Sequence, residues 1–310
     1  MRALSLAPVL AMGLAPAVGW ACACGCEVFE VGTSSMFPEG SGGMAFAEVD
    51  YQDQNHNWSG SSEAAAADNP DKDIRTSFFT FGYQDMFNRR WGIRFDLPYE
   101  SRHFETTGGA TGDDLVSLDF SGLGDIRVQA IYTGISDDLS TGLTFGLKLP
   151  TGSYARNDAY GDIDRDTEIG SGSTDILLGG FHRFSLETDY GWSGFVQVQL
   201  DLPVLAQGRY RPGAEFDSAL GAYYNGWSIG RMRISPIAQL KASFRGRDTG
   251  ANASSPVASG YGRLLFAPGI EFTVHTFKVY ADVERPLYQR FDGNQLAASV
   301  LFKLEASAMF

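Results

Sequence analysis

The chain has 310 residues, 13% of them aromatic, and a formal net charge of −13. This length suffices for one large β domain or two smaller ones. The negative charge argues against a nucleic-acid partner, because phosphate binding requires a basic surface.

Residues 1–23 have the pattern of a secretory signal peptide. Arg2 is their only charge, the stretch from Ala3 to Val18 is apolar, and small residues follow. The apolar stretch is too short to span a membrane as a helix. Cleavage after Ala21 and cleavage after Ala23 both fit, and a lipid anchor on a nearby cysteine stays open. We therefore leave this segment out of the fold prediction.

Residues 24–43 form a separate segment without a sustained period. All three cysteines of the chain stand together as Cys22, Cys24 and Cys26. They either bind a soft metal ion such as Cu(I) or Zn²⁺, or join another protein, or are partly removed by cleavage with the rest in a disulfide. In extended form residues 27–43 reach about 55 Å, enough to thread a barrel lumen as a plug.

The remaining chain, residues 44–310, alternates between apolar and polar side chains. At its end, residues 296–310 place an apolar side chain at every second position, whereas Lys303 and Glu305 lie on the other face. Lipid on one face and water on the other explain both sets. A terminal Phe310 in such a strand is similar to the assembly signature of bacterial outer-membrane barrels. For this stretch alone, the last strand of a soluble β-sandwich is the alternative.

Twelve strands follow from this pattern, and the connections between them alternate between short and long. An even strand number with short turns at one end and long polar loops at the other is typical of a transmembrane barrel. We predict an all-β, antiparallel barrel of about 12 strands in the bacterial outer membrane, with periplasmic N- and C-termini. The expected strands are 44–58, 73–87, 91–105, 115–135, 141–154, 173–185, 190–205, 215–228, 231–245, 260–276, 277–288 and 295–310.

Charged residues recur on one face of many strands. Unpaired charge in an apolar core costs several kcal/mol per group, so this face lines either water or a dense network of ion pairs. Twelve strands enclose more space than the eight that side chains fill. The mixture of signs predicts an electrostatic constriction. The candidate lumen residues are Arg127, Lys148, Asp201, Lys241, Arg245, Lys278, Asp282, Glu284 and Lys303.

Three central motifs resemble a known family. They read GLGDIR from Gly122, STGLTFGLKLPTG from Ser140 and GSGSTDILLGG from Gly170. They are similar to the outer-membrane transporters grouped with the meta-pathway of phenol degradation. The resemblance spans about residues 78–310 and implies a porin-like barrel or a channel for hydrophobic solutes. The cysteine-rich segment is not part of the family pattern.

Catalytic chemistry is scarce. The four histidines are scattered and no nucleophile motif accompanies them, so we expect no catalytic residues and no enzyme activity. Asp162, Asp164, Asp166 and Glu168 alternate in the longest loop. Their oxygen atoms suit Ca²⁺, although a solvated acidic loop tip is the alternative.

The sequence thus predicts a channel for passive passage of small solutes, hydrophobic or aromatic ones among them. The alternative is a non-conducting barrel whose cysteine-rich segment binds a metal or a partner protein. Apart from Ca²⁺ or a soft metal, no cofactor is expected. The expected partners are outer-membrane lipid, the barrel assembly machinery through the C-terminal strand, and a small-molecule solute.

Overall fold

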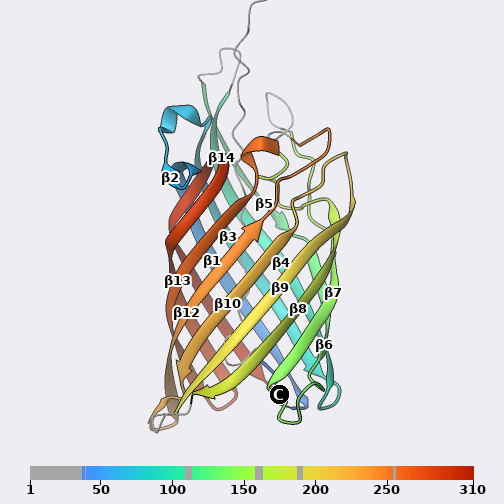
Figure 1. Ribbon diagram of the computed structural model, residues 1–310, viewed down its shortest axis with the longest axis vertical. Coiled ribbons are helices and arrows are strands. Elements are labelled where there is room, and N and C mark those ends of the chain that lie inside the picture. Colours follow the sequence, from blue (N-terminus) through green and yellow to red (C-terminus); the bar gives the residue numbers. More distant parts are fainter. Residues whose placement is uncertain (1–36, 39, 109–113, 158–162, 187–190, 254–255) are drawn as a thin grey trace, which may run out of the picture.

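The period of two in the sequence becomes β-strand along nearly the whole described chain. The computed structural model describes residues 37–38, 40–108, 114–157, 163–186, 191–253 and 256–310. Their strands tilt around a common axis (Figure 1). The elements are β1 (Gly42–Gly60), β2 (Ser62–Glu63), η1 (Ala66–Asp68), β3 (Asp71–Met86), β4 (Trp91–Gly108), β5 (Asp114–Leu123), β6 (Ile126–Tyr132), β7 (Thr141–Leu149), β8 (Ser173–Leu186), β9 (Trp192–Ala206), β10 (Glu215–Tyr224), β11 (Trp227–Ile229), β12 (Met232–Arg245), η2 (Pro256–Ala258), β13 (Tyr261–Val274) and β14 (Phe277–Met309).

The sheet closes on itself. Neighbouring strands follow the order β10-β9-β8-β7-β6-β4-β3-β1-β14-β13-β12, and β10 pairs with β12 to complete the ring. β14 makes two passes: its first half pairs with β13 and its second half with β1. The amide of Met309 donates to the carbonyl of Thr276 at 2.9 Å, so the end of β14 lies beside its beginning. The eleven labelled strands of the ring therefore make twelve passes, which confirms the predicted barrel.

The two ends of the barrel differ as the connection lengths predict. Short turns join the strands at the lower end in Figure 1, and the longer loops gather at the upper end. Gly43 and Phe310 lie together at the lower end, where the amide of each donates to the carbonyl of the other at 3.0 Å. A periplasmic position for this end remains a prediction.

Three expected strands are shorter or interrupted in the structure. The expected strand 141–154 ends at Leu149. The expected strand 115–135 is interrupted between β5 and β6, where the Thr151 hydroxyl donates to the carbonyl of Gly124 at 2.8 Å and accepts from the amide of Ile126 at 3.0 Å. β5 pairs with β4, and β6 pairs with both β4 and β7. The expected strand 215–228 stops at Tyr224. Gly226 follows with a positive φ of 104°, a conformation that favours glycine and breaks the strand.

The outer and inner faces of the barrel differ in polarity. Large apolar side chains are exposed outside, among them Phe81 at 55%, Leu220 at 54% and Leu304 at 50%. The inner face buries many polar and charged groups, together with an apolar cluster that includes Met86, Phe181 and Phe195. No helix among the described residues is long and apolar enough to cross a membrane.

Candidate functional site in the barrel lumen

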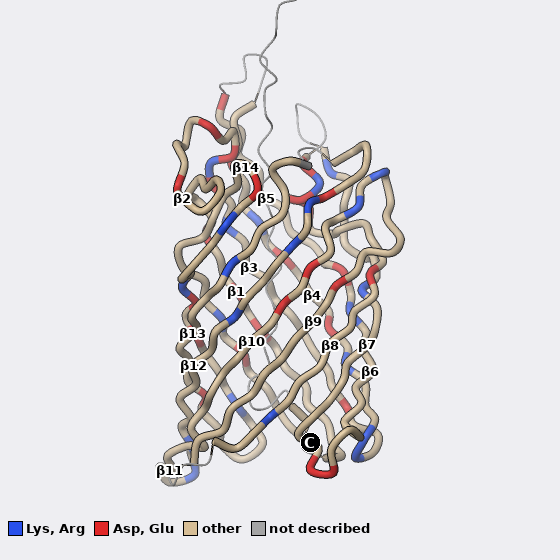
Figure 2. The backbone as a smooth tube through the Cα atoms, in the orientation of Figure 1, with Lys and Arg blue, Asp and Glu red and all other residues tan. Residues whose placement is uncertain are grey.

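The predicted lumen residues lie on the inward faces of their strands. Lys148, Asp201, Lys241, Asp282, Glu284 and Lys303 are buried, and Arg127, Arg245 and Lys278 are partly buried on the same face. In Figure 2, charged residues of both signs follow one another along the strands between the two ends.

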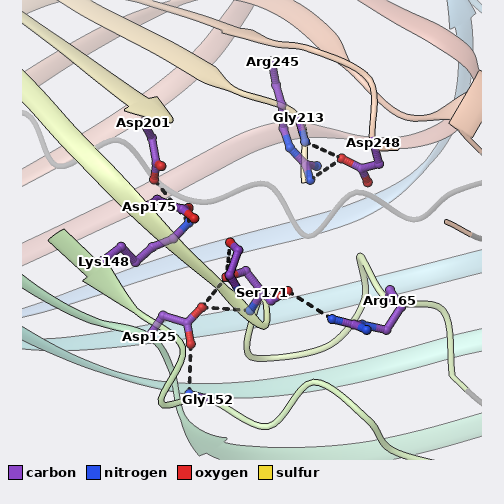
Figure 3. Close-up of polar contacts among 11 residues, drawn as sticks. Asp125, Lys148, Gly152, Arg165, Ser171, Asp175, Asp201, Gly213, Arg245 and Asp248 are labelled. Carbon is purple, nitrogen blue, oxygen red and sulfur yellow. Dashed lines mark hydrogen bonds and ion pairs between the residues drawn. The ribbon is translucent and has the colours of Figure 1, made fainter. Parts of the chain in front are cut away.

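Three buried lysines each lie between two carboxylates. Lys148 Nζ is 2.6 Å from Asp175 and 3.2 Å from Asp201 (Figure 3). Burying a cation is unfavourable unless it is paired, and two carboxylates on neighbouring strands provide that pairing. The other two groups are Lys241 with Glu284 at 2.5 Å and Asp282 at 3.6 Å, and Lys303 with Glu48 at 2.8 Å and Asp50 at 3.2 Å.

Several of these partners escaped the sequence prediction. Glu48, Asp50 and Asp175 complete the lysine groups, and all three are buried. Glu48 and Asp50 are two positions apart in β1, so they lie on one face with the buried Gln52. That alternation was visible in the sequence. Their pairing with Lys303 was not, because it depends on the register between β1 and β14.

A single carboxylate fastens both ends of the loop between β7 and β8. Asp125 Oδ1 accepts a hydrogen bond from the amide of Gly152 at 2.9 Å. Its Oδ2 accepts from the amide of Ser171 at 2.8 Å and from the Ser171 hydroxyl at 2.5 Å (Figure 3). Gly152 and Gly170 touch through their backbones, since a Cβ on Gly170 would lie 2.4 Å from Gly152. We call Asp125, Gly152, Gly170 and Ser171 the loop clamp.

Beyond the loop clamp, the same loop packs into the barrel mouth. Arg102 donates to the carbonyl of Thr167 and to that of Glu168 at 3.2 Å. Thr167 has no exposed surface. The carboxylate of Glu168 accepts from the amide of Arg156 at 2.5 Å. These contacts hold the centre of the loop against the inner wall formed by β4.

The acidic residues predicted to bind Ca²⁺ have different surroundings. Burial raises the pKa of Asp166 well above its ordinary value, the Asp248 carboxylate raises it further, and Arg245 opposes the shift. Burial also raises the pKa of Glu168, against the effect of Arg156. The carbonyl of Asp164 accepts from the amide of Thr167 at 3.0 Å. Asp162 lies outside the described residues, as do Cys22, Cys24 and Cys26.

Two further loops join this assembly at the upper end. Asp248 accepts from Tyr210 Oη at 2.8 Å, from the amide of Gly213 at 2.8 Å and from Arg245 at 2.9 Å. The guanidinium of Arg165 lies over the rings of both Tyr154 and Tyr210, 4.8 and 4.7 Å from their centroids. The loops that follow β7, β9 and β12 are therefore connected to one another.

Small polar cavities follow one another below these loops. The uppermost, of ≈ 60 Å³, is lined by Lys148, Glu100 and Ile169 among others, and Glu100 and Ile169 also line a second cavity of ≈ 40 Å³. Asp96 and Arg127 are shared between the second cavity and a third of ≈ 40 Å³. Polar cavities of this size hold water. Neighbouring cavities along the inner wall thus share lining residues.

The sequence of the chain matches a known protein family. The family described as "Putative MetA-pathway of phenol degradation" matches residues 58–225, just over half of the chain. The chain belongs to this family. No curated protein matches the sequence.

Among solved structures, the chain is similar to the COG4313 outer membrane channel from Pseudomonas putida F1. The two share 13% identity with a TM-score of 0.66, over 91% of this chain and 100% of the other. The β domain of the Bordetella autotransporter BrkA aligns with a TM-score of 0.49 at 15% identity, over 87% and 100% of the two chains. At 13% identity the likeness to the Pseudomonas putida channel concerns the fold, which is that of an outer-membrane barrel.

The phenol-degradation family match includes the whole loop clamp. Asp125 comes from the motif GLGD, Gly152 from LPTG, and Gly170 and Ser171 from GSGS. Motifs that are far apart in the sequence therefore meet at one carboxylate. Sequence analysis found the motifs but did not predict that Asp125 joins them.

At the lower end, Phe37 occupies the lumen of this family member. Its ring lies 5.1 Å from that of Phe181 and 5.3 Å from that of Phe195, and only 3% of the residue is exposed. Arg183 donates to the carbonyl of Pro38 at 3.4 Å. Residues 37–38 belong to the segment predicted as a possible plug; the rest of that segment before Phe37 lies outside the described residues.

Proposed function

We propose that the protein is a channel of the bacterial outer membrane for passive passage of small solutes. One observation carries this proposal: the closed barrel is apolar outside and has a series of polar cavities along its inner wall. Lipid contacts the outer face, and the C-terminal half of β14 is the segment offered to the barrel assembly machinery. No catalytic role is proposed for any residue.

The inner wall favours polar solutes over purely apolar ones. Each lysine group offers both a cation and carboxylates, so a solute with hydrogen-bonding groups can replace water at the wall. An aromatic compound that carries hydroxyl or carboxyl groups satisfies both this wall and the description of the family. A bare hydrocarbon would have to displace water from charged groups without replacing its hydrogen bonds.

Phe37 favours a second candidate, a barrel closed by its own N-terminal segment. In this alternative the protein is a non-conducting scaffold, and Cys22, Cys24 and Cys26 hold a soft metal or a partner. Thiol titration and metal analysis of the mature protein test it. If the mature protein has neither free thiols nor bound metal, this result would count against the scaffold.

Single-channel recording in a planar bilayer separates the two functions. The refolded mature protein is compared with Phe37→Ala and with Phe87→Ala, a control in an exposed lower turn. Discrete steps from the unaltered protein support an open channel. Steps that appear only in Phe37→Ala support closure by this segment. Silence in all three, with insertion verified, favours the scaffold.

Calcium binding by Asp162, Asp164, Asp166 and Glu168 also stays a proposal. Glu168 already pairs with Arg156, so Ca²⁺ would have to displace this contact. Millimolar Ca²⁺ should then slow proteolysis of the loop between β7 and β8. An unchanged rate of loop cleavage would rule out calcium binding at this site.

A further inference from the structure

A polar cluster lies on the outer face of the barrel, close to the loop end. Along the pairing of β3, β4 and β5, one outward row is apolar and consists of Phe79, Tyr99 and Leu123. The next outward row towards the loops is Ser77, Ser101 and Ser121, and the row after that is Arg75, His103 and Asp119. The apolar band therefore ends two rows before His103, and the cluster is accessible from water.

Three side chains of this cluster converge. One ligand atom each of Asp73, His103 and Glu105 lies within 4.8 Å of the others, and all three residues are partly buried. Asp73 on β3 is the direct register partner of Glu105 on β4, so two rigid strands position the set. One imidazole with two carboxylates is a donor set that suits Zn²⁺ and related divalent ions.

Asp119 orients the imidazole for this purpose. Its Oδ1 lies 2.7 Å from His103 Nδ1, whereas His103 Nε2 lies 3.3 Å from Glu105 Oε1. Histidines that bind metals commonly donate their second N–H to a carboxylate, which fixes the tautomer. With the proton on Nδ1, the lone pair of Nε2 faces a carboxylate. This arrangement is repulsive unless a metal ion or a second ring proton lies between them.

Unpaired oxygen atoms beside the set give a second, independent indication. Asp73 Oδ1 and Asp53 Oδ1 are buried, and no hydrogen-bond donor among the described residues reaches either of them. Arg75 pairs with the other oxygen of Asp73 at 3.1 Å. Buried carboxylate oxygens without a donor are unfavourable, and a bound cation would satisfy them.

We propose that Asp73, His103 and Glu105 bind one divalent transition-metal ion with the ligand preferences of Zn²⁺, and that Asp119 positions His103. The ion joins β3 to β4 on the water-exposed rim. The proposal is independent of transport through the lumen. The competing arrangement is a protonated His103 between Glu105 and Asp119, without a metal.

Zn²⁺ titration by calorimetry tests the site on the refolded protein in detergent. Cys22, Cys24 and Cys26 are replaced by serine throughout, so that thiols do not contribute. We expect His103→Asn to remove one Zn²⁺ site per barrel and Asp119→Asn to weaken it roughly 10- to 100-fold. His182→Asn is the matched control, since His182 is exposed near the opposite end of the barrel. This variant should keep the Zn²⁺ site with unchanged affinity.

Heat-modifiable migration on gels verifies that each variant is folded. Should His103→Asn fail this check, Asp73→Asn replaces it, with the same expected loss of one site. Equal stoichiometry and affinity for the parent and for the folded ligand variant would overturn the proposal. Loss of the site in His103→Asn together with full affinity in Asp119→Asn would overturn the positioning role.

Discussion

Removal of the Asp125 carboxylate should release the loop between β7 and β8. Asp125 is buried, with 6% of the residue exposed, and its two oxygens accept three hydrogen bonds from Gly152 and Ser171. A hydrogen bond to a charged group contributes about 1.5–3 kcal/mol. Because the three share one carboxylate and do not add fully, we take about 3 kcal/mol for the set.

This magnitude predicts a measurable change in loop opening. Since 1.4 kcal/mol corresponds to a factor of ten, Asp125→Ala should raise the released fraction of the loop roughly 100-fold. Arg156 and Arg165 are trypsin sites in this loop. When opening is fast relative to cleavage, the native cleavage rate follows the released fraction. Cleavage after these arginines should therefore accelerate by about the same factor.

A matched control separates the clamp from a general effect of losing an aspartate. Asp138 also accepts a backbone hydrogen bond, from the amide of Ser140 at 3.1 Å, but in a turn at the other end of the barrel. Asp138→Ala should leave the cleavage rate unchanged. The reasoning would be refuted by equal rates for Asp125→Ala and the unaltered protein, provided that the variant migrates as a folded barrel.

Three further variants test other contacts. Gly170→Ala should release the loop much as Asp125→Ala does, because its Cβ would meet the Gly152 backbone at 2.4 Å. Gly246→Ala is the control and should leave the loop in place, because the nearest contact of its Cβ would be 3.6 Å. The same trypsin assay measures both variants. Because burial and Asp248 raise the pKa of Asp166, the docked loop binds this proton more tightly than the released loop does. Docking of the loop is then strongest below the ordinary aspartate pKa near 3.8 and weakens as the pH rises towards the raised pKa of Asp166. The rate of loop cleavage, divided by the rate for a peptide substrate to correct for the protease's own pH dependence, should increase over that pH range. Asp166→Asn should abolish the increase. Lys303→Met should lower the free energy of unfolding by about 3–5 kcal/mol, because Glu48 and Asp50 would stay buried without their cation. Lys278→Met is its control in urea unfolding, since no ion pair of Lys278 is found among the described residues; equal losses for both would contradict the ion-pair argument.

The barrel itself could be predicted because each strand carries its own evidence. In β14, Lys303 and Glu305 alternate with Phe302 and Leu304, and the structure places the first pair inside and the second outside. A period of two requires no knowledge of neighbouring strands. The same local signal predicted that Lys148 and Lys241 face inward.

Contacts between strands could not be predicted in this way. The carboxylates around Lys303 come from β1, at the other end of the chain, and only the register brings them together. The break at Asp125 has the same origin. Locally the segment continues as a strand, but the hydroxyl of Thr151, from a distant part of the chain, binds the carbonyl of Gly124 and the amide of Ile126 in place of a strand partner.

The seam between β1 and β14 also determines the order of assembly. Met44 pairs with Met309, so closure of the ring joins its first strand to the last pass of the chain. Until then β1 exposes a row of unpaired amides and carbonyls, which is an aggregation hazard in water. Contacts so distant in sequence form slowly. A folding intermediate of this protein should therefore be an open, curved sheet with β1 and β14 as its free edges, and ring closure should be its last and slowest step.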